Sequence, residues 1–188
     1  MTRTIVLVDM DGVLADFDLH FASLWRERFP GRPPFDLMRR TCFRVADELP
    51  PEWREDARSI YSVAGFFLDV PPVTGALEAM LEMPHVGLDV WICTSPLTRY
   101  NHCVLEKYQW IEQHLGFDWT ERVIMTKDKG LVRGDVLIDD HPSLPGREKA
   151  LWRQIVFDTP YNRHISDLTR MTSWASWRQA LIAEGVLQ

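Results

Sequence analysis

The chain begins with a short apolar run that ends in acidic residues. Ile5 to Val8 are apolar and mostly β-branched, and Asp9 and Asp11 follow with one residue between them. A continuous apolar run of this length is typical of a strand that is buried on both faces, as in a parallel sheet. We therefore predict a strand whose carboxyl end carries a pair of carboxylates.

Beyond residue 74, short apolar runs alternate with helical patterns. Strands are predicted at 88–93, 123–126, 136–138 and 155–157, the last being the final strand, and helices at 75–83, at 99–115 and around 174–181. Strands that alternate with helices indicate a parallel sheet with right-handed crossovers. The predicted fold class is α/β, a Rossmann-like parallel sheet core flanked by helices.

Residues 18–73 have a different character. Prolines recur from Pro30 to Pro72, no strand pattern is present, and helices are predicted at 19–29, 35–49 and 52–64. Prolines of this density break regular elements into short pieces. We predict that 18–73 forms a small inserted helical cap, and that 1–17 and 74–188 together form the α/β core.

Composition narrows the possible partners. The 188 residues are 46% hydrophobic and 26% charged, which is ordinary for a soluble globular protein. The net charge of −6 argues against a nucleic-acid polymer, although five arginines between positions 26 and 40 form a local basic region that a small anion could use. No run approaches a membrane span, and three cysteines without metal or pairing spacing indicate reduced thiols. We expect a cytoplasmic protein without a membrane partner.

Polar residues follow each of the first four predicted strands. In chain order they are Asp9 and Asp11, then Thr94 and Ser95, then Lys129, then Asp139 and Asp140. The carboxyl ends of parallel strands lie along one edge of a sheet, where ligands bind in such folds. Carboxylates suit Mg²⁺, while hydroxyls at a helix start and a lysine suit phosphate.

The first acid pair has two alternative interpretations. A calcium-binding loop that starts at Asp9 would need a ligand, a glycine and a glutamate where this chain has Val13, Leu14 and His20, so that alternative fails. A solvated turn at Asp11-Gly12 stays open on the motif alone. The order of the four polar groups along the chain favours a site over a turn.

This ordered set resembles the haloacid dehalogenase-like superfamily of phosphotransferases. The stretches DMDGVLADF at 9–17, ICTSP at 92–96, EKYQW at 106–110, TKDK at 126–129 and LIDDHP at 137–142 are similar to the 5′(3′)-deoxyribonucleotidase family. The resemblance covers nearly the whole chain and is thin from about 30 to 60. It implies a magnesium-dependent phosphatase that acts on deoxyribonucleoside monophosphates.

The resemblance also implies a role for each matching position. Asp9 would be the nucleophile that forms an aspartyl-phosphate, and Asp11 would be the general acid and base. Asp9, Asp11, Asp139 and Asp140 would form the Mg²⁺ site; Thr94, Ser95, Lys107 and Lys129 would hold the phosphate; and Phe17, Phe43 and Tyr61 would line the nucleoside pocket. A homodimer is implied by the resemblance alone.

Some positions depart from the family pattern. Thr98 stands where the family often has lysine, Cys42 precedes Phe43 where a Phe-Trp pair is usual, and Tyr61 stands where tryptophan is usual. These departures leave base and sugar preference open. A phosphatase of another small monoester and a non-catalytic nucleotide-binding protein are the alternatives, and the second would predict the loss of Asp9 or Asp11.

Overall fold

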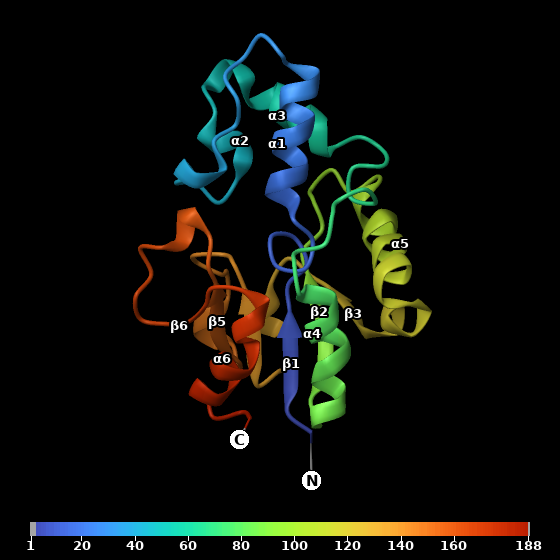
Figure 1. Cartoon of the computed structure of the whole chain (residues 1–188), viewed down its shortest axis with the longest axis vertical. Coiled ribbons are helices and arrows are strands. Elements are labelled where there is room, and N and C mark those ends of the chain that lie inside the picture. The colour runs from blue at the N-terminus through green and yellow to red at the C-terminus, as the bar shows by residue number, and fades with distance from the viewer. Residues whose placement is uncertain (1–2, 188) are drawn as a thin grey trace.

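A computed structural model describes residues 3–187, and it contains one parallel sheet (Figure 1). The strands are β1 (Ile5–Val8), β2 (Asp89–Thr94), β3 (Val123–Met125), β4 (Val136–Asp139), β5 (Arg153–Phe157) and β6 (Thr169–Met171). Their order across the sheet is β3-β2-β1-β4-β5-β6, and every neighbouring pair is parallel. The predicted α/β fold with a parallel sheet is confirmed.

The sheet extends one strand beyond the predicted last strand at 155–157. The strand predicted at 155–157 is present within β5, but it is not the last, because β6 pairs in parallel with β5 at the edge of the sheet. The strand was missed because it is short and carries Arg170 at its centre, which breaks the apolar pattern. The Arg170 guanidinium binds Asp158 at 2.8 Å and so fastens β6 to the loop that follows β5.

The two faces of the sheet are covered differently. The helices α4 (Ala76–Glu82), α5 (Cys103–Leu115) and α6 (Trp177–Ala183) share a hydrophobic cluster with Val6 and Val8. Leu7 points to the other face because side chains alternate along a strand. There it packs in a smaller cluster with Leu137, Leu144 and Trp152, which come from a strand and from non-helical segments. The helical layer therefore lies mainly on one face.

The chain leaves the sheet and returns to it through two adjacent segments. The N–H of Asp16 donates to the carbonyl of Pro71 at 2.7 Å, and the N–H of Val73 donates to the carbonyl of Leu14 at 2.8 Å. Between them, α1 (Phe17–Arg28), α2 (Val45–Glu48) and α3 (Arg54–Tyr61) lie beyond the carboxyl ends of the strands (Figure 1). We call residues 18–73 the cap segment, and its status as a separate unit stays a prediction.

The predicted helix at 35–49 is wrong. The structure has a 3₁₀ turn at Leu37–Arg39 and the short helix α2, with a non-helical stretch between them. The Glu48 carboxylate accepts hydrogen bonds from the backbone N–H groups of Thr41 and Cys42, each at 2.8 Å. These side-chain bonds satisfy the backbone locally and replace the bonds that a helix would supply.

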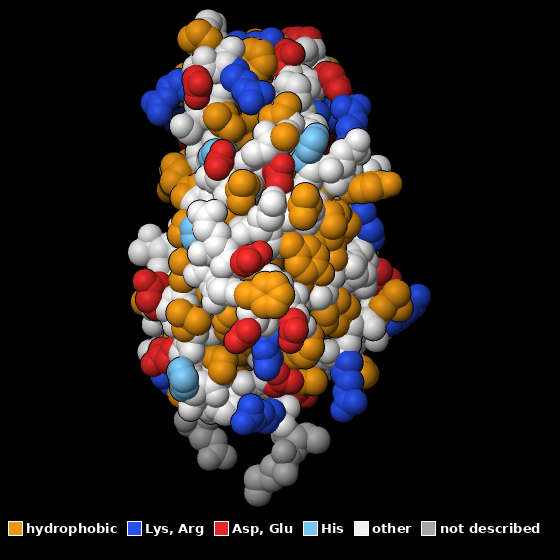
Figure 2. Space-filling model, turned by 90° about the vertical axis from the view of Figure 1, so that its right-hand side faces the viewer, with side chains coloured by type: hydrophobic (Ala, Val, Ile, Leu, Met, Phe, Trp, Pro, Cys, Tyr) orange, Lys and Arg blue, Asp and Glu red, His pale blue; other side chains and the backbone are white. Residues whose placement is uncertain are grey.

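On the face drawn in Figure 2, apolar side chains are interspersed with acidic and basic ones over both the cap segment and the core. Across residues 3–187, none of the helices is both long enough and apolar enough to cross a membrane. Cys42, Cys93 and Cys103 are all free thiols. The cytoplasmic location and the homodimer stay predictions.

Candidate active site

The two acidic pairs meet because β1 and β4 are neighbours. Val8 pairs with Ile138, and the N–H of Asp9 donates to the carbonyl of Ile138 at 2.9 Å. Asp9, Asp139 and Asp140 are all buried, and each offers a carboxylate oxygen within 4.8 Å of the others. The sequence prediction that the strand ends bring these carboxylates to one point agrees with this geometry.

Lys129 lies between two of these carboxylates. Its Nζ is 2.7 Å from Asp9 Oδ1 and 2.6 Å from Asp139 Oδ2, and the side chain is buried. It comes from a 3₁₀ turn after β3, and its carbonyl accepts a hydrogen bond from Trp152 Nε1 at 3.0 Å. Burial alone would lower the pKa of Lys129, but the two carboxylates hold that pKa above its ordinary value. The lysine is therefore a permanent positive charge beside Asp9.

Lys107 brings a second positive charge from α5. Its Nζ, which is fully buried, contacts Asp11 Oδ2 at 2.7 Å, Thr94 Oγ1 at 2.8 Å and the Ser95 carbonyl at 2.9 Å. Lys107 is therefore a buried, fully paired lysine and not a solvated one. Burial raises the pKa of Asp11, and the charge on Lys107 opposes that rise.

The two carboxylates after β4 have different partners. Both oxygens of Asp139 are engaged, one by Lys129 and the other by the N–H of His141 at 2.8 Å. Asp140 Oδ2 accepts a hydrogen bond from the Tyr161 hydroxyl, whereas Asp140 Oδ1 is buried without a partner, as is Asp11 Oδ1. Burial raises the pKa of Asp139 to about 6 and raises the pKa of Asp140 well above its ordinary value.

Burying a carboxylate oxygen without a partner costs free energy, so Asp11 Oδ1 and Asp140 Oδ1 each need a positive group or a donor beside them. A divalent cation would stabilise the ionised form of neighbouring acids and supply the missing partner. Oxygen donors are also the ligands that Mg²⁺ prefers. Among the described residues, Asp9, Asp139 and Asp140 therefore form the group of acids that fits a hard cation; both oxygens of Asp139 already accept a hydrogen bond, whereas Asp140 Oδ1 has no partner. Asp11 Oδ1 is a further carboxylate oxygen without a partner.

The loop after β1 approaches Asp140 closely at Gly12. Gly12 has a φ of +78°, and a Cβ at this position would lie 2.3 Å from Asp140 Oδ2. The loop is closed locally, since the Met10 carbonyl accepts hydrogen bonds from Leu14 at 2.8 Å and Ala15 at 2.9 Å. Glycine is needed here both for its backbone conformation and for the space it leaves.

The predicted nucleoside-binding aromatics fall into two groups. Phe17 and Tyr61 have ring centroids 5.8 Å apart, and both also lie near Phe66. Phe43 packs instead on His141, with ring centroids 4.0 Å apart. The three predicted aromatics therefore do not form a single cluster.

Sequence reasoning missed several residues beside these groups. Glu106 accepts hydrogen bonds from the backbone N–H groups of Gly65 at 2.7 Å and Phe67 at 3.0 Å, which holds the Phe67 ring 5.4 Å from Lys107 Nζ. Glu106 adjoins Lys107 in the EKYQW stretch, so the signal was present in the sequence. Tyr161 carries no comparable motif.

The arginines of the predicted basic region are partly used inside the cap segment. Arg32 pairs with Asp56 at 2.6 Å, and its guanidinium lies over the Phe29 ring at 4.4 Å. Arg40 is buried and pairs with Asp18. These two arginines thus stabilise the cap segment, and they are not available to bind an anion as part of the predicted local basic region.

Comparisons with known proteins agree with this arrangement. A family model described as 5′ nucleotidase, deoxy (Pyrimidine), cytosolic type C protein matches residues 3–186. The human 5′(3′)-deoxyribonucleotidase, cytosolic type, is 44% identical over an alignment of 191 positions, and the alignment covers 96% of this chain and 95% of the human protein.

Solved structures share the fold at low sequence identity. A HAD family hydrolase from Deinococcus radiodurans R1, with bound phosphate and sodium, has a TM-score of 0.64 at 18% identity and covers 99% of this chain and 98% of that one. The HAD-hydrolase YfnB from Bacillus subtilis, bound to magnesium, has a TM-score of 0.61 at 12% identity, with 96% and 99% covered. This chain therefore shares the fold of these HAD hydrolases, belongs to the 5′(3′)-deoxyribonucleotidase family, and is a phosphoric monoester hydrolase.

Proposed function

We propose that this chain hydrolyses deoxyribonucleoside monophosphates with Mg²⁺, through an aspartyl-phosphate on Asp9. The observation that carries the proposal is the arrangement of two acids and two lysines at the end of β1. Asp9 pairs with Lys129 at 2.7 Å, and Asp11 pairs with Lys107 at 2.7 Å. The human relative, which is named a 5′(3′)-deoxyribonucleotidase, supports the substrate class.

The reaction proceeds in two displacements. An oxygen of Asp9 attacks phosphorus, the bond from phosphorus to the nucleoside oxygen breaks, and Asp11 gives that oxygen its proton. Water then attacks the phosphorus, Asp11 takes a proton from it, and the bond to Asp9 breaks with release of phosphate. Burial raises the pKa of Asp11, which favours the protonated form required for the first step.

The remaining groups bind the phosphate and the cation. Lys107 and Lys129 neutralise phosphate oxygens, with Thr94 and the Ser95 backbone beside them. Asp9, Asp11 and Asp140 would hold Mg²⁺, and Asp139 acts indirectly because it positions Lys129. Bound magnesium supplies charge neutralisation on the phosphoryl group during transfer.

Removing the metal is expected to abolish activity. Excess chelator should stop phosphate release from dUMP, and added Mg²⁺ should restore it. Ca²⁺ should replace Mg²⁺ poorly, because Ca²⁺ is larger and tolerates looser geometry than an in-line transfer requires. Phosphate release is the measurement, with the protein's thermal unfolding midpoint recorded in parallel as a control for folding. Full activity in excess chelator would contradict a metal-dependent mechanism.

Replacing Tyr61 with alanine is expected to weaken nucleotide binding selectively. The Tyr61 and Phe17 rings could stack on a base, so Tyr61→Ala should raise the KM for dUMP and leave the KM for p-nitrophenyl phosphate nearly unchanged. Tyr61→Phe, which keeps the ring, is the matched control and should retain the wild-type KM. Equal effects of Tyr61→Ala on both substrates would make Tyr61 a core residue.

A second candidate function is hydrolysis of another small phosphate monoester by the same site. The aromatic residues of the cap segment favour a flat base over a sugar. We expect deoxyribonucleotides to be hydrolysed faster than ribonucleotides, and uracil and thymine bases to precede purines, an order that comes from the family resemblance. A rate panel tests this: if sugar phosphates outrun every deoxynucleotide, the nucleotidase proposal fails and the phosphatase proposal survives.

A further inference from the structure

Asp140 is held at two points by consecutive residues of the loop after β5. The hydroxyl of Tyr161 donates to Asp140 Oδ2, and Asn162 Nδ2 donates to the Asp140 carbonyl at 2.8 Å. Asn162 Nδ2 also donates to the Phe157 carbonyl at 2.7 Å, which ties the loop to the end of β5. Both residues are buried. The side chain and the backbone of Asp140 are therefore fixed separately.

The bond from Tyr161 decides which oxygen of Asp140 stays available. Oδ2 is occupied by the hydroxyl and lies against Gly12, where a Cβ would come within 2.3 Å of it. Oδ1 is buried without a partner among the described residues. A carboxylate fixed in this way presents one oxygen and cannot rotate freely, so the hydroxyl selects Oδ1 as the ligand atom.

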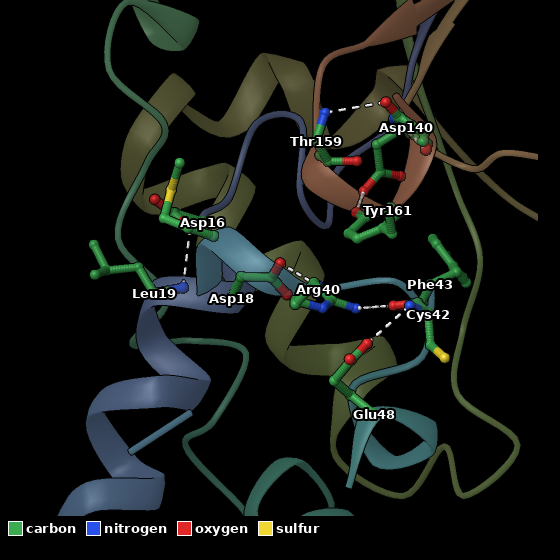
Figure 3. A network of polar contacts seen from close by, with 12 residues as sticks. Asp16, Asp18, Leu19, Arg40, Cys42, Phe43, Glu48, Asp140, Thr159 and Tyr161 are labelled. Carbon is green, nitrogen blue, oxygen red and sulfur yellow. Dashed lines mark hydrogen bonds and ion pairs between the residues drawn. The ribbon is translucent and has the colours of Figure 1, made fainter. Parts of the chain in front are cut away.

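Arg40 connects this carboxylate to the cap segment. Its guanidinium carbon lies 4.3 Å from the centroid of the Tyr161 ring, and it forms an ion pair with Asp18 at the start of α1. It also donates to the Cys42 carbonyl at 2.8 Å and to the carbonyl of Phe43. Figure 3 shows the series Asp18, Arg40, Tyr161 and Asp140, which leads from α1 to the sheet edge.

Phe43 makes a second contact at the same place. Its ring packs on His141 and meets the Tyr161 ring edge-on, with centroids 5.8 Å apart. Arg40 fixes the position of Phe43 through the Phe43 carbonyl. One arginine of the cap segment therefore contacts both Tyr161 and the backbone of Phe43, the aromatic residue that packs on His141.

We propose that Tyr161 is a positioning residue for Asp140 and that Arg40 makes this position depend on the cap segment. The inference rests on the proposed function, because it assigns Asp140 Oδ1 to the cation. Partners that orient a ligating carboxylate typically affect metal affinity by roughly 10- to 100-fold when they are removed. A tyrosine that only fills space would affect stability and leave metal affinity unchanged.

The first test is Tyr161→Phe, which keeps the ring against Arg40 and Phe43 and removes only the hydroxyl. We expect Mg²⁺ binding, followed by calorimetric titration of the free protein, to weaken by roughly 10- to 100-fold. The unfolding midpoint should fall by no more than about 5 °C. Tyr100→Phe, at an exposed tyrosine, is the matched control and should bind Mg²⁺ as the wild type does.

The second test is Arg40→Lys, alone and combined with Tyr161→Phe. Lysine keeps the charge that pairs with Asp18 and loses the planar contact with the Tyr161 ring. We expect Arg40→Lys to weaken Mg²⁺ binding several-fold and to raise the KM for dUMP. The double variant should bind Mg²⁺ no more weakly than Tyr161→Phe, since both changes act through one hydroxyl. If Tyr161→Phe fails to fold, Arg40→Lys alone carries the test.

The outcomes test the role of the Tyr161 hydroxyl and the link through Arg40 separately. Unchanged Mg²⁺ affinity in Tyr161→Phe would overturn the positioning role, and strictly additive losses in the double variant would overturn the link through Arg40. If the wild-type protein itself binds no Mg²⁺, the proposed function fails as well. Wild-type binding combined with a selective loss in Tyr161→Phe, with the midpoint lowered by no more than about 5 °C, would establish the role of the hydroxyl.

Discussion

Asp9→Asn is expected to lower kcat for dUMP by several orders of magnitude and to leave the protein folded. An amide oxygen cannot form the phosphoryl-enzyme bond, so the covalent route is lost. The fold should persist because asparagine has nearly the same size, and because Lys129 keeps its other partner, Asp139, at 2.6 Å. Steady-state phosphate release measures the loss, and acid quenching with labelled substrate detects the phosphoryl-enzyme in the wild type alone.

The control for this variant is an acid-to-amide change outside the site. Asp167 is exposed on the surface of the α/β part of the chain, and Asp167→Asn should retain wild-type turnover and a wild-type unfolding midpoint. Near-normal turnover of Asp9→Asn in the presence of Mg²⁺ would show that Asp9 is not the nucleophile. This conclusion would hold whether or not the metal site is assigned correctly.

Asp11→Asn is expected to lower kcat for a deoxynucleotide by roughly 10²- to 10⁴-fold, the usual contribution of general acid–base catalysis. The nucleoside oxygen is a poor leaving group and needs the proton that Asp11 supplies. The nitrophenolate of p-nitrophenyl phosphate needs no proton, so its release in the first displacement should be affected far less. Rapid mixing measures that first displacement as a burst of nitrophenolate.

We expect the Asp11→Asn variant to remain folded. Asparagine can still accept the bond that Lys107 Nζ makes at 2.7 Å, so the buried lysine keeps a partner. The unfolding midpoint should therefore change little. Equal losses in the burst phase for p-nitrophenyl phosphate and in turnover of the deoxynucleotide would argue against Asp11 as the acid.

The residues at the strand ends were predictable because topology alone brings them together. Asp9, Asp139 and Lys129 each follow a strand whose apolar run is visible in the sequence, and parallel pairing aligns the strand ends. The resemblance to a known family then assigned roles to these positions. Neither argument required knowledge of a side-chain conformation.

The rest depended on tertiary packing, which a local pattern does not encode. Lys107 lies inside α5, and its contact with Asp11 exists only because that helix docks beside β2. Tyr161 follows β5 in a short turn, and its partner Asp140 is 21 positions away in the chain. β6 was missed because Arg170 interrupts an already short strand. For Lys107 the family resemblance supplied the position but not the contact, and for Tyr161 no local sequence signal marked the residue.

The adjacent crossing points at Asp16 and Pro71, joined at 2.7 Å, bear on how such proteins diversify. A chain segment whose two ends already meet can be lengthened, shortened or exchanged at small cost, because the entropic cost of closing a loop rises only slowly with the length of the loop. The strands that carry the acids would not move. Substrate choice and chemical mechanism can therefore evolve as separate traits in this architecture, one by replacement of the segment between the crossing points and the other by point changes at the strand ends.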